Sequence, residues 1–259
     1  MLLAIDVGNT HTVIGVWAGE TLSDSWRITT RTDRTADELS VLLNSLFEFR
    51  GSIATTEIKA AIVSSVVPSL THTIVTMTQR LYGVRCLVVG PGLKTGMPIR
   101  YEDPREVGAD RIVNAVAAYH RWPEGLIIVD FGTATTFDVV DPEGAYLGGA
   151  ICPGIGISSR ALFDYAARLP KVEFVRPKSV VGRNTVASIQ SGLVFGYVGL
   201  VEGLIQRIKA DVDFPCRVVA TGGLAHQLAK ETDQISLVDD GLTLVGLRII
   251  YERNHHEDH

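Results

Sequence analysis

The hydrophobic residues near the start of this chain fall into two short runs separated by a polar stretch. Residues 2–5 form one run, residues 12–17 form the other, and Asp6–Thr10 lies between them. Short apolar runs bounded by turn residues predict buried strands. Gly8-Asn9 is a favoured pair in hairpin turns. We therefore expect two antiparallel strands joined by a tight turn that carries Gly8-Asn9.

This turn contains groups that can hold a ligand. It combines the Asp6 carboxylate with an amide, two hydroxyls and Gly8, whose backbone can approach a ligand closely. Backbone N–H groups in such a turn can cradle phosphate oxygens, and the carboxylate can position a metal ion. An ordinary hairpin with a polar tip explains the same residues.

Helical spacing appears further along the chain. Thr35 and Glu38 match a capping box, apolar residues follow at helical spacing, and Gly51 is expected to end that helix. A second helix is expected from Pro68 to the region of Gly83.

Further strands are expected around these helices. They lie at residues 25–29, 60–64 and 86–89. Three meandering strands followed by alternating strands and helices are typical of the ribonuclease-H-like fold, an α/β fold in which a mixed sheet is flanked by helices.

The stretch at residues 126–140 repeats the design of the first hairpin. In an ungapped overlay, Asp130, Gly132, Thr133 and Thr136 fall on Asp6, Gly8, Asn9 and Thr12, and the flanking apolar runs coincide. Such a repeat indicates two copies of one supersecondary unit. Two Asp-x-Gly turns, one in each half of the chain, are suited to hold a polyphosphate from both sides of a cleft.

Composition excludes several classes of protein. The chain has 259 residues, 46% hydrophobic and 20% charged, which indicates a globular protein of one large domain or two moderate ones. A net charge of −5 argues against a nucleic-acid-binding surface. The three cysteines are isolated, so neither a zinc site nor a disulfide framework is expected. We see no signal peptide and no apolar run near the roughly 20 residues of a membrane span, and we expect a cytoplasmic enzyme.

Residues 90–96 resemble a P-loop, because this glycine-rich segment contains a Lys-Thr pair. A P-loop needs glycine directly before its lysine and a helix directly after it. Here Leu93 precedes Lys94, and Met97-Pro98-Ile99 is poor helix sequence. We reject the P-loop, which leaves a flexible junction loop or a loop of the substrate site.

Asp110 and Arg111 are expected at the start of a helix, because apolar residues follow them at helical spacing. The helix dipole there favours anions and is expected to keep Asp110 ionised. An ionised carboxylate can accept the proton of an attacking hydroxyl, and an arginine can bind a substrate carboxylate. A first-turn Asp in a surface ion pair is the simpler alternative.

Taken together, these motifs resemble a known family. The two Asp-x-Gly turns and the late Thr221-Gly222-Gly223 loop resemble the actin, sugar kinase and Hsp70 superfamily. The segment from Gly90 to Arg111, with Gly-Pro-Gly-x-Lys-Thr-Gly and then Glu-Val-Gly-Ala-Asp-Arg, resembles type III pantothenate kinase. The resemblance covers nearly the whole chain and implies ATP-dependent phosphorylation of pantothenate to 4′-phosphopantothenate, the first step of coenzyme A biosynthesis.

The resemblance also implies roles for individual residues. It assigns Asp110 as the general base and Asp130 as the ligand of a monovalent cation, K⁺ or NH₄⁺, next to ATP-Mg²⁺. The implied ATP-binding residues are Asp6, Val7, Gly8, Asn9, Thr10, His11, Thr12, Val13 and Thr133. The implied pantothenate-binding residues are Tyr101, Gly108, Ala109, Asp110, Arg111 and Thr185, with Thr185 supplied by the partner subunit of a homodimer.

The duplication predicts two ribonuclease-H-like domains, at residues 1–118 and 119–259. A long helix is expected from Asn184 to Lys209, with glycines at three- and four-residue spacing that permit close packing on the sheet or across a dimer interface. The histidine-containing tail at 254–259 is expected to be a solvated terminus. Two other functions remain open from the residues alone: a kinase for another small hydroxy substrate, and a non-catalytic nucleotide-binding regulator.

Overall fold

The computed structural model describes residues 1–50, 53–166 and 169–255. The chain divides into two compact units, Met1–Arg121 with Gly241–His259, and Trp122–Asp240. The expected boundary at residue 118 lies inside the last helix before this division. The predicted domain 119–259 included the C-terminal helix, but this helix belongs to the first unit. Gly51, expected as a helix stop, lies outside the described residues, as do the last four residues of the tail.

The first unit is built on a five-stranded mixed sheet in the order β3-β2-β1-β4-β5. Its strands are β1 (Leu2–Val7), β2 (His11–Ala18), β3 (Thr21–Thr29), β4 (Ala60–Ser65) and β5 (Cys86–Val88). β1 pairs antiparallel with β2 and parallel with β4, so Asp6 lies opposite both Val13 and Ser64. The expected meander and the parallel strands after it are confirmed.

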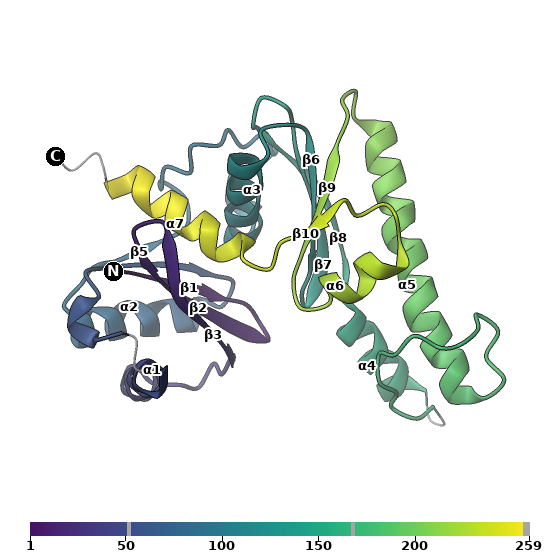
Figure 1. Cartoon of the computed structure of the whole chain (residues 1–259), viewed down its shortest axis with the longest axis horizontal. Helices are drawn as coiled ribbons and strands as arrows, with labels where there is room; N and C mark the ends of the chain where they lie inside the picture. The colour runs from purple at the N-terminus through teal and green to yellow at the C-terminus, as the bar shows by residue number, and fades with distance from the viewer. Residues whose placement is uncertain (51–52, 167–168, 256–259) are drawn as a thin grey trace. The chain divides into compact units, whose positions relative to one another are not determined.

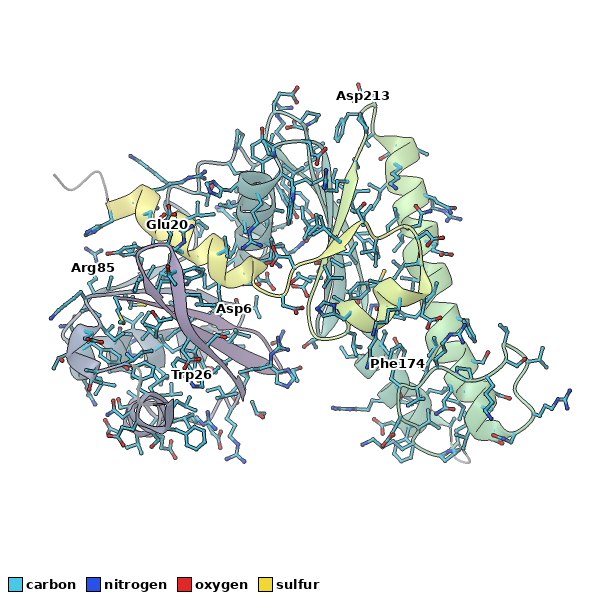
Figure 2. The ribbon with its side chains drawn as sticks, viewed as in Figure 1. Asp6, Glu20, Trp26, Arg85, Phe174 and Asp213 are labelled. Atoms are coloured by element: carbon cyan, nitrogen blue, oxygen red, sulfur yellow. The ribbon has the colours of Figure 1, made fainter. Side chains whose placement is uncertain are left out.

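Helices cover both faces of this sheet (Figure 1). They are α1 (Ala36–Arg50), α2 (Pro68–Tyr82), α3 (Ala109–Arg121) and α7 (Leu242–His255), with short 3-10 turns η1 (Thr55–Glu57) and η2 (Pro104–Glu106). α1 and α2 pack on one face, where the Trp26 ring on β3 lies 5.3 Å from the Phe47 ring on α1, with the two rings tilted by 42° (Figure 2). Burying such aromatic rings contributes strongly to the core.

The capping box that starts α1 is confirmed. The backbone N–H of Thr35 donates to the Glu38 carboxylate at 2.8 Å, and the N–H of Glu38 donates to Thr35 Oγ1 at 3.2 Å. α2 begins at Pro68 and ends at Tyr82, and the next residue, Gly83, caps it with a left-handed φ of 68°.

α3 and α7 lie side by side on the other face of the sheet. α7 contacts β1 and β4 as well as α3. Gly246 permits this close packing, because a Cβ atom there would overlap the Val113 carbonyl. These contacts explain why α7 joins the first unit although 119 residues of the second unit, Trp122–Asp240, precede it.

The second unit repeats the same sheet topology, in the order β10-β9-β6-β7-β8. Its strands are β6 (Leu126–Phe131), β7 (Ala134–Val140), β8 (Tyr146–Pro153), β9 (Arg217–Thr221) and β10 (Leu237–Val238). Its helices are α4 (Ile155–Tyr165), α5 (Thr185–Asp211), α6 (Ala225–Leu228) and the 3-10 turn η3 (Ala229–Glu231). The duplicated ribonuclease-H-like fold expected from the sequence is confirmed.

The long helix α5 has two different faces. One face, which includes Val194, Tyr197 and Val201, is buried in the core of the second unit. The opposite face carries exposed glycines. Within the described residues α5 is the one helix whose length and composition also suit a membrane span, although the sequence analysis expected no such segment. It meets that test because charged residues are confined to Glu202 and the last turns, a composition that core helices share.

Candidate active site

The first candidate phosphate loop joins β1 to β2 and spans residues 8–10. The backbone N–H of Gly8 donates to the His11 carbonyl at 3.0 Å. The hairpin is confirmed, but neither Gly8 nor Asn9 has a positive φ, so the loop is not one of the tight turns that a Gly-Asn pair favours. Asn9, Thr10 and His11 are exposed, which leaves the loop accessible to a ligand.

Thr30, which the sequence analysis did not single out, braces this loop from the end of β3. Its hydroxyl donates to the Gly8 carbonyl at 2.7 Å and lies 2.9 Å from Thr12 Oγ1. Its backbone N–H donates to the Thr10 carbonyl at 2.9 Å. These three contacts hold one side of the loop. Asp6 lies close to the same loop, one residue pair before the end of β1 (Figure 2).

The second candidate phosphate loop joins β6 to β7 and contains only Gly132 and Thr133. Asp130, at the end of β6, pairs with Thr136 on β7 and with Thr221 on β9. Gly222 follows Thr221 with a φ of 94°, and a Cβ atom there would lie 2.6 Å from Asp130 Oδ1. The expected Gly-Gly loop therefore lies directly against the Asp130 carboxylate.

The two loops differ by one residue. Asp6 lies opposite Val13, whereas Asp130 lies opposite Thr136. The ungapped overlay therefore holds through the first strand of each hairpin and fails after the loop, because the second loop is one residue shorter. Thr136 takes the place of Val13, and its expected match with Thr12 is wrong.

Tyr197, another residue that the sequence analysis missed, supports the second loop from α5. Its hydroxyl oxygen lies 2.5 Å from Thr135 Oγ1 and 3.0 Å from the Pro153 carbonyl. Gly154 follows Pro153 and donates its N–H to the Thr133 carbonyl at 3.1 Å. Because burial disfavours a charged phenolate, it raises the pKa of Tyr197. Tyr197 thus stays neutral and bridges β7 and β8 next to the loop.

Asp110 lies in the first turn of α3, as expected. Its Oδ1 accepts the backbone N–H of Arg111 at 2.9 Å and lies over Gly108, where a Cβ atom would come within 2.6 Å. That Asp110 is ionised stays a prediction, and its surroundings act on its pKa in both directions. Burial raises the pKa of this carboxyl, and the N–H and guanidinium of Arg111 offset only part of that effect. A raised pKa makes the carboxylate a better proton acceptor.

Arg111, the next residue, is 7% exposed. The segment before α3 encloses a cavity of about 290 Å³ within the first unit, whose walls include Leu93, Val107 and Ile112. The loop at residues 90–96 therefore lines a cavity together with the start of α3. Tyr101 lies between these two segments in sequence and is half-buried.

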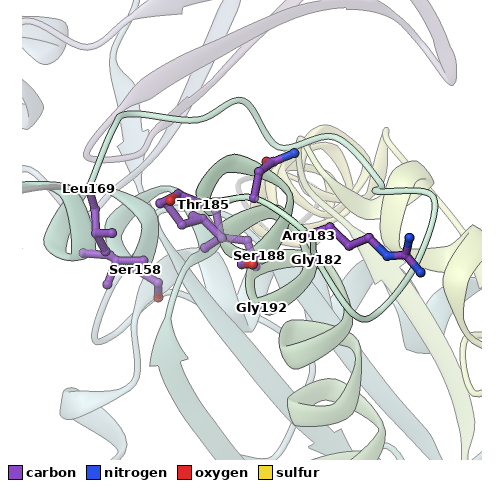
Figure 3. A pocket seen from close by; sticks show the side chains of 11 residues that line it. Ser158, Leu169, Gly182, Arg183, Thr185, Ser188 and Gly192 are labelled. Carbon is purple, nitrogen blue, oxygen red and sulfur yellow. The ribbon is translucent and has the colours of Figure 1, made fainter.

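Thr185 is the first residue of α5, after Asn184 caps the helix by accepting the N–H of Ala187 at 2.8 Å. Thr185 is exposed and lines an open cavity of about 810 Å³ within the second unit, together with Ser158 and Ser188 (Figure 3). The side chain of Arg183 points away from these residues. Its other walls include Leu162, Leu169 and Leu193, so the cavity places hydroxyls and a helix N-terminus beside an apolar wall.

Comparisons with known proteins decide the family. The type III pantothenate kinase family model matches residues 2–207. The chain is 59% identical over 255 residues to a type III pantothenate kinase of Myxococcus xanthus (strain DK1622), covering 98% of this chain and 99% of that protein. It is 54% identical over 254 residues to one of Geobacter sulfurreducens (strain ATCC 51573 / DSM 12127 / PCA), with coverage of 98% and 99%. This chain belongs to the type III pantothenate kinase family.

Members of this family are ATP-dependent kinases of pantothenate in coenzyme A biosynthesis, and the chain is accordingly an enzyme of the transferase class. The fold agrees with that assignment. It is similar to the inorganic polyphosphate/ATP-glucomannokinase from Arthrobacter sp. strain KM, with a TM-score of 0.53, 12% identity, and coverage of 98% of this chain and 99% of that one. This likeness shows the fold alone.

In this type III pantothenate kinase the expected site residues divide between the two units. The first unit holds the loop from Asp6 to Val13, Tyr101 and the run Gly108–Arg111, and the second unit holds Asp130, Thr133 and Thr185. Within the described residues, no group of three or more His, Cys, Asp or Glu side chains is arranged to hold a metal ion. A cation held largely by nucleotide phosphates and one or two carboxylates fits this donor set, as is usual for Mg²⁺.

Proposed function

We propose that this type III pantothenate kinase uses Asp110 as the general base on the hydroxyl of pantothenate. The observation that carries the proposal is the position of the carboxylate in the first turn of α3, where one oxygen is held by the N–H of Arg111 at 2.9 Å. A carboxylate fixed in this way and raised in pKa by burial can accept the hydroxyl proton as the oxygen attacks the γ-phosphoryl group.

Each unit contributes one phosphate loop to ATP binding in this proposal. The first loop offers exposed backbone and side-chain groups of Asn9, Thr10 and His11, held by Thr30. The second offers Gly132 and Thr133; Gly154 donates its N–H to the Thr133 carbonyl, and Tyr197 contacts Thr135 just after the loop. Loops whose donors are already in place stabilise the charge on phosphate oxygens without having to reorganise.

The substrate-binding residues are Tyr101 and the run from Gly108 to Arg111. The guanidinium of Arg111 has the fork geometry that binds a carboxylate through two parallel hydrogen bonds, and pantothenate carries one carboxylate. Residues beside Asp110 would thus orient the substrate, because binding the acid end of pantothenate limits where its hydroxyl can lie.

Asp130 would hold a monovalent cation, K⁺ or NH₄⁺. Its carboxylate lies against the backbone of Gly222, where the space is too small for any side chain, and would supply an oxygen ligand to this cation. Mg²⁺ would be held by the nucleotide phosphates with Asp6 or Asp130. When bound, these cations neutralise charge on the transferring phosphoryl group.

The role of Asp110 is tested by Asp110→Asn. We expect turnover to fall by about 10²–10⁴-fold, the usual contribution of a general base, with ATP affinity unchanged. Asp37→Asn is the matched control, because Asp37 also follows the first residue of a helix but its side chain is 85% exposed. Pantothenate-dependent ADP formation, measured with and without K⁺, provides both readouts. A near-normal kcat for Asp110→Asn would remove Asp110 from the base role.

We further propose a homodimer in which Thr185 serves the partner's substrate. Large apolar side chains near Thr185 are exposed in the single chain, among them Phe163, Tyr165 and Val181. The exposed face of α5 adds glycines at which a Cβ atom would meet nothing within 4 Å, namely Gly192, Gly196 and Gly199. Exposed apolar side chains and small residues of this kind favour an interface. The small-residue face, expected to pack on the sheet or across a dimer, is not packed in the single chain.

Mixing two inactive variants tests this arrangement. Asp110→Asn and Thr185→Val each damage one half of a shared site. If Thr185 acts across the interface, a mixed dimer contains one intact site, and activity returns after subunit exchange. If Thr185 acts within its own chain, the mixture stays as inactive as its components. Sedimentation of the wild-type protein gives the oligomeric state independently.

A cytoplasmic location is also part of the proposal. Cys86, Cys152 and Cys216 are all free thiols, which suits a reducing compartment. Fractionation of cells that express the tagged chain, with a disulfide-bonded periplasmic marker as reference, tests the location.

A further inference from the structure

The end of the last helix holds a loop that lies far from it in sequence. The Asn254 side chain makes two hydrogen bonds to the backbone of one residue, Lys94. The N–H of Lys94 donates to Asn254 Oδ1 at 3.1 Å, and Asn254 Nδ2 donates to the Lys94 carbonyl at 2.9 Å. Arg253 Nη1 donates to the carbonyl of Thr95. The carboxamide thus pairs with Lys94 as a neighbouring strand would.

The loop at residues 90–96 needs such support because it has little structure of its own. It contains Gly90, Gly92 and Gly96, and the last two have positive φ angles of 93° and 70°. Glycine-rich backbone loses much conformational freedom when it is ordered. Inside the loop, the N–H of Leu93 donates to the Gly90 carbonyl at 3.2 Å. The contacts from α7 therefore supply much of the restraint on this segment.

The same loop forms one wall of the cavity at the start of α3. Gly90, Pro91 and Leu93 line one side, and Val107 and Ala109 line the other. Ala109 directly precedes Asp110, which does not itself line the cavity, so the loop can influence the proposed base only through its contact with the first turn of α3. Asn254 does not line this cavity. It can act on the cavity only through the loop.

We propose that Asn254 and Arg253 are positioning residues for pantothenate. They hold residues 90–96 in the conformation that keeps the cavity beside Ala109 formed before the substrate binds. A loop released from α7 would occupy this conformation only part of the time, and the apparent affinity for a ligand falls in proportion to that fraction. The proposal rests on the proposed placement of the substrate site at residues 101–111.

The main test is Asn254→Ala. Alanine is a better helix former than asparagine, so the substitution removes the two contacts to Lys94 without weakening α7 through propensity. Two hydrogen bonds of ordinary net strength correspond to about a tenfold change in affinity. We expect the KM for pantothenate to rise about tenfold, with kcat and the KM for ATP within about twofold of wild type.

Two further variants separate positioning from stability. Asn254 Nδ2 also donates to the Ile250 carbonyl one turn earlier, at 2.7 Å. Ser45→Ala removes the same kind of bond in α1, where Ser45 Oγ donates to the Val41 carbonyl at 2.9 Å, and serves as the control. Arg253→Ala removes the contact to Thr95 and should raise the same KM.

Hydrogen exchange directly measures how well the amides of residues 90–96 are protected. The Lys94 amide should exchange faster in Asn254→Ala than in wild type, because its acceptor is gone, whereas amides of the sheet keep their rates. An unchanged KM for pantothenate, or a parallel loss of kcat, ATP affinity and melting temperature, would overturn the proposal. Failure of the proposed site shows instead in an active Asp110→Asn variant, so the two failures are distinguishable.

Discussion

Replacing Gly222 by alanine should damage the second unit more than the same replacement at Gly19. Both glycines have positive φ angles, 94° at Gly222 and 58° at Gly19. A Cβ atom at Gly222 would lie 2.6 Å from Asp130 Oδ1 and 2.7 Å from the backbone N and C of Phe131. At Gly19 it would meet nothing within 4 Å. Gly19→Ala therefore measures the cost of a positive φ alone. Gly222→Ala adds the steric overlap of the new Cβ atom with Asp130 and Phe131.

The magnitudes follow from these two terms. An alanine with positive φ costs about 1–2 kcal/mol, which applies at both positions. Overlap with atoms that are held by neighbouring strands adds about 1–3 kcal/mol at Gly222. For a chain of this size, about 1 kcal/mol shifts Tm by roughly 2–4 °C. We expect Tm to fall by about 4 °C in Gly19→Ala and by about 10 °C in Gly222→Ala.

Calorimetry measures the loss of Tm in each variant, and steady-state kinetics measures the change in the KM for ATP. Because relief of the overlap has to move either Gly222 or Asp130, Gly222→Ala should also raise the KM for ATP several-fold. Gly19→Ala should leave both kinetic constants for ATP unchanged. Equal Tm losses in the two variants, with an unchanged KM for ATP in Gly222→Ala, would refute the idea that the Gly222 loop lies against Asp130.

Two other predictions concern Asp110 and Tyr197. Burial raises the pKa of Asp110, so the ionised, proton-accepting carboxylate is lost as pH falls through that raised pKa. We therefore expect kcat/KM for pantothenate to fall at low pH, with its midpoint above the usual aspartate pKa of about 4. The same group favours folding more as pH falls, so Asp110→Asn should melt no lower than wild type at pH 7, and a clear loss of Tm would contradict this. Tyr197→Phe leaves the Pro153 carbonyl without its partner, and Tm should drop by about 3–8 °C, with no drop as the contrary result.

Local sequence signals predicted most of the fold. Thr35 and Glu38 marked a helix start correctly because a capping box is satisfied by residues three positions apart. Gly83 marked a helix end for a similarly local reason. The position of Asp110 at the start of α3 also followed from periodicity. Its pKa did not, because burial depends on the elements that surround the carboxyl and not on its neighbours in the chain.

Two of the missed features depend on contacts between distant segments, and a third depends on turn geometry. Asn254 and Lys94 are 160 positions apart, and no local pattern marks an asparagine as the partner of a particular backbone group. The placement of α7 with the first unit has the same origin, since the amphipathic pattern of a helix does not say which sheet it covers. The one-residue difference between the two phosphate loops arose from turn geometry, which the matching residue types of the hairpins concealed.

The return of α7 to the first unit makes the second unit a nested insertion. Residues 122–240 are contiguous and contain every element of the second unit, whereas the first unit is complete only when the last helix of the chain has been added. Synthesis order and folding order are then reversed: the half that is made first is completed last. Limited proteolysis of a purified chain truncated after residue 240 should find residues 122–240 protected and residues 1–121 cleaved.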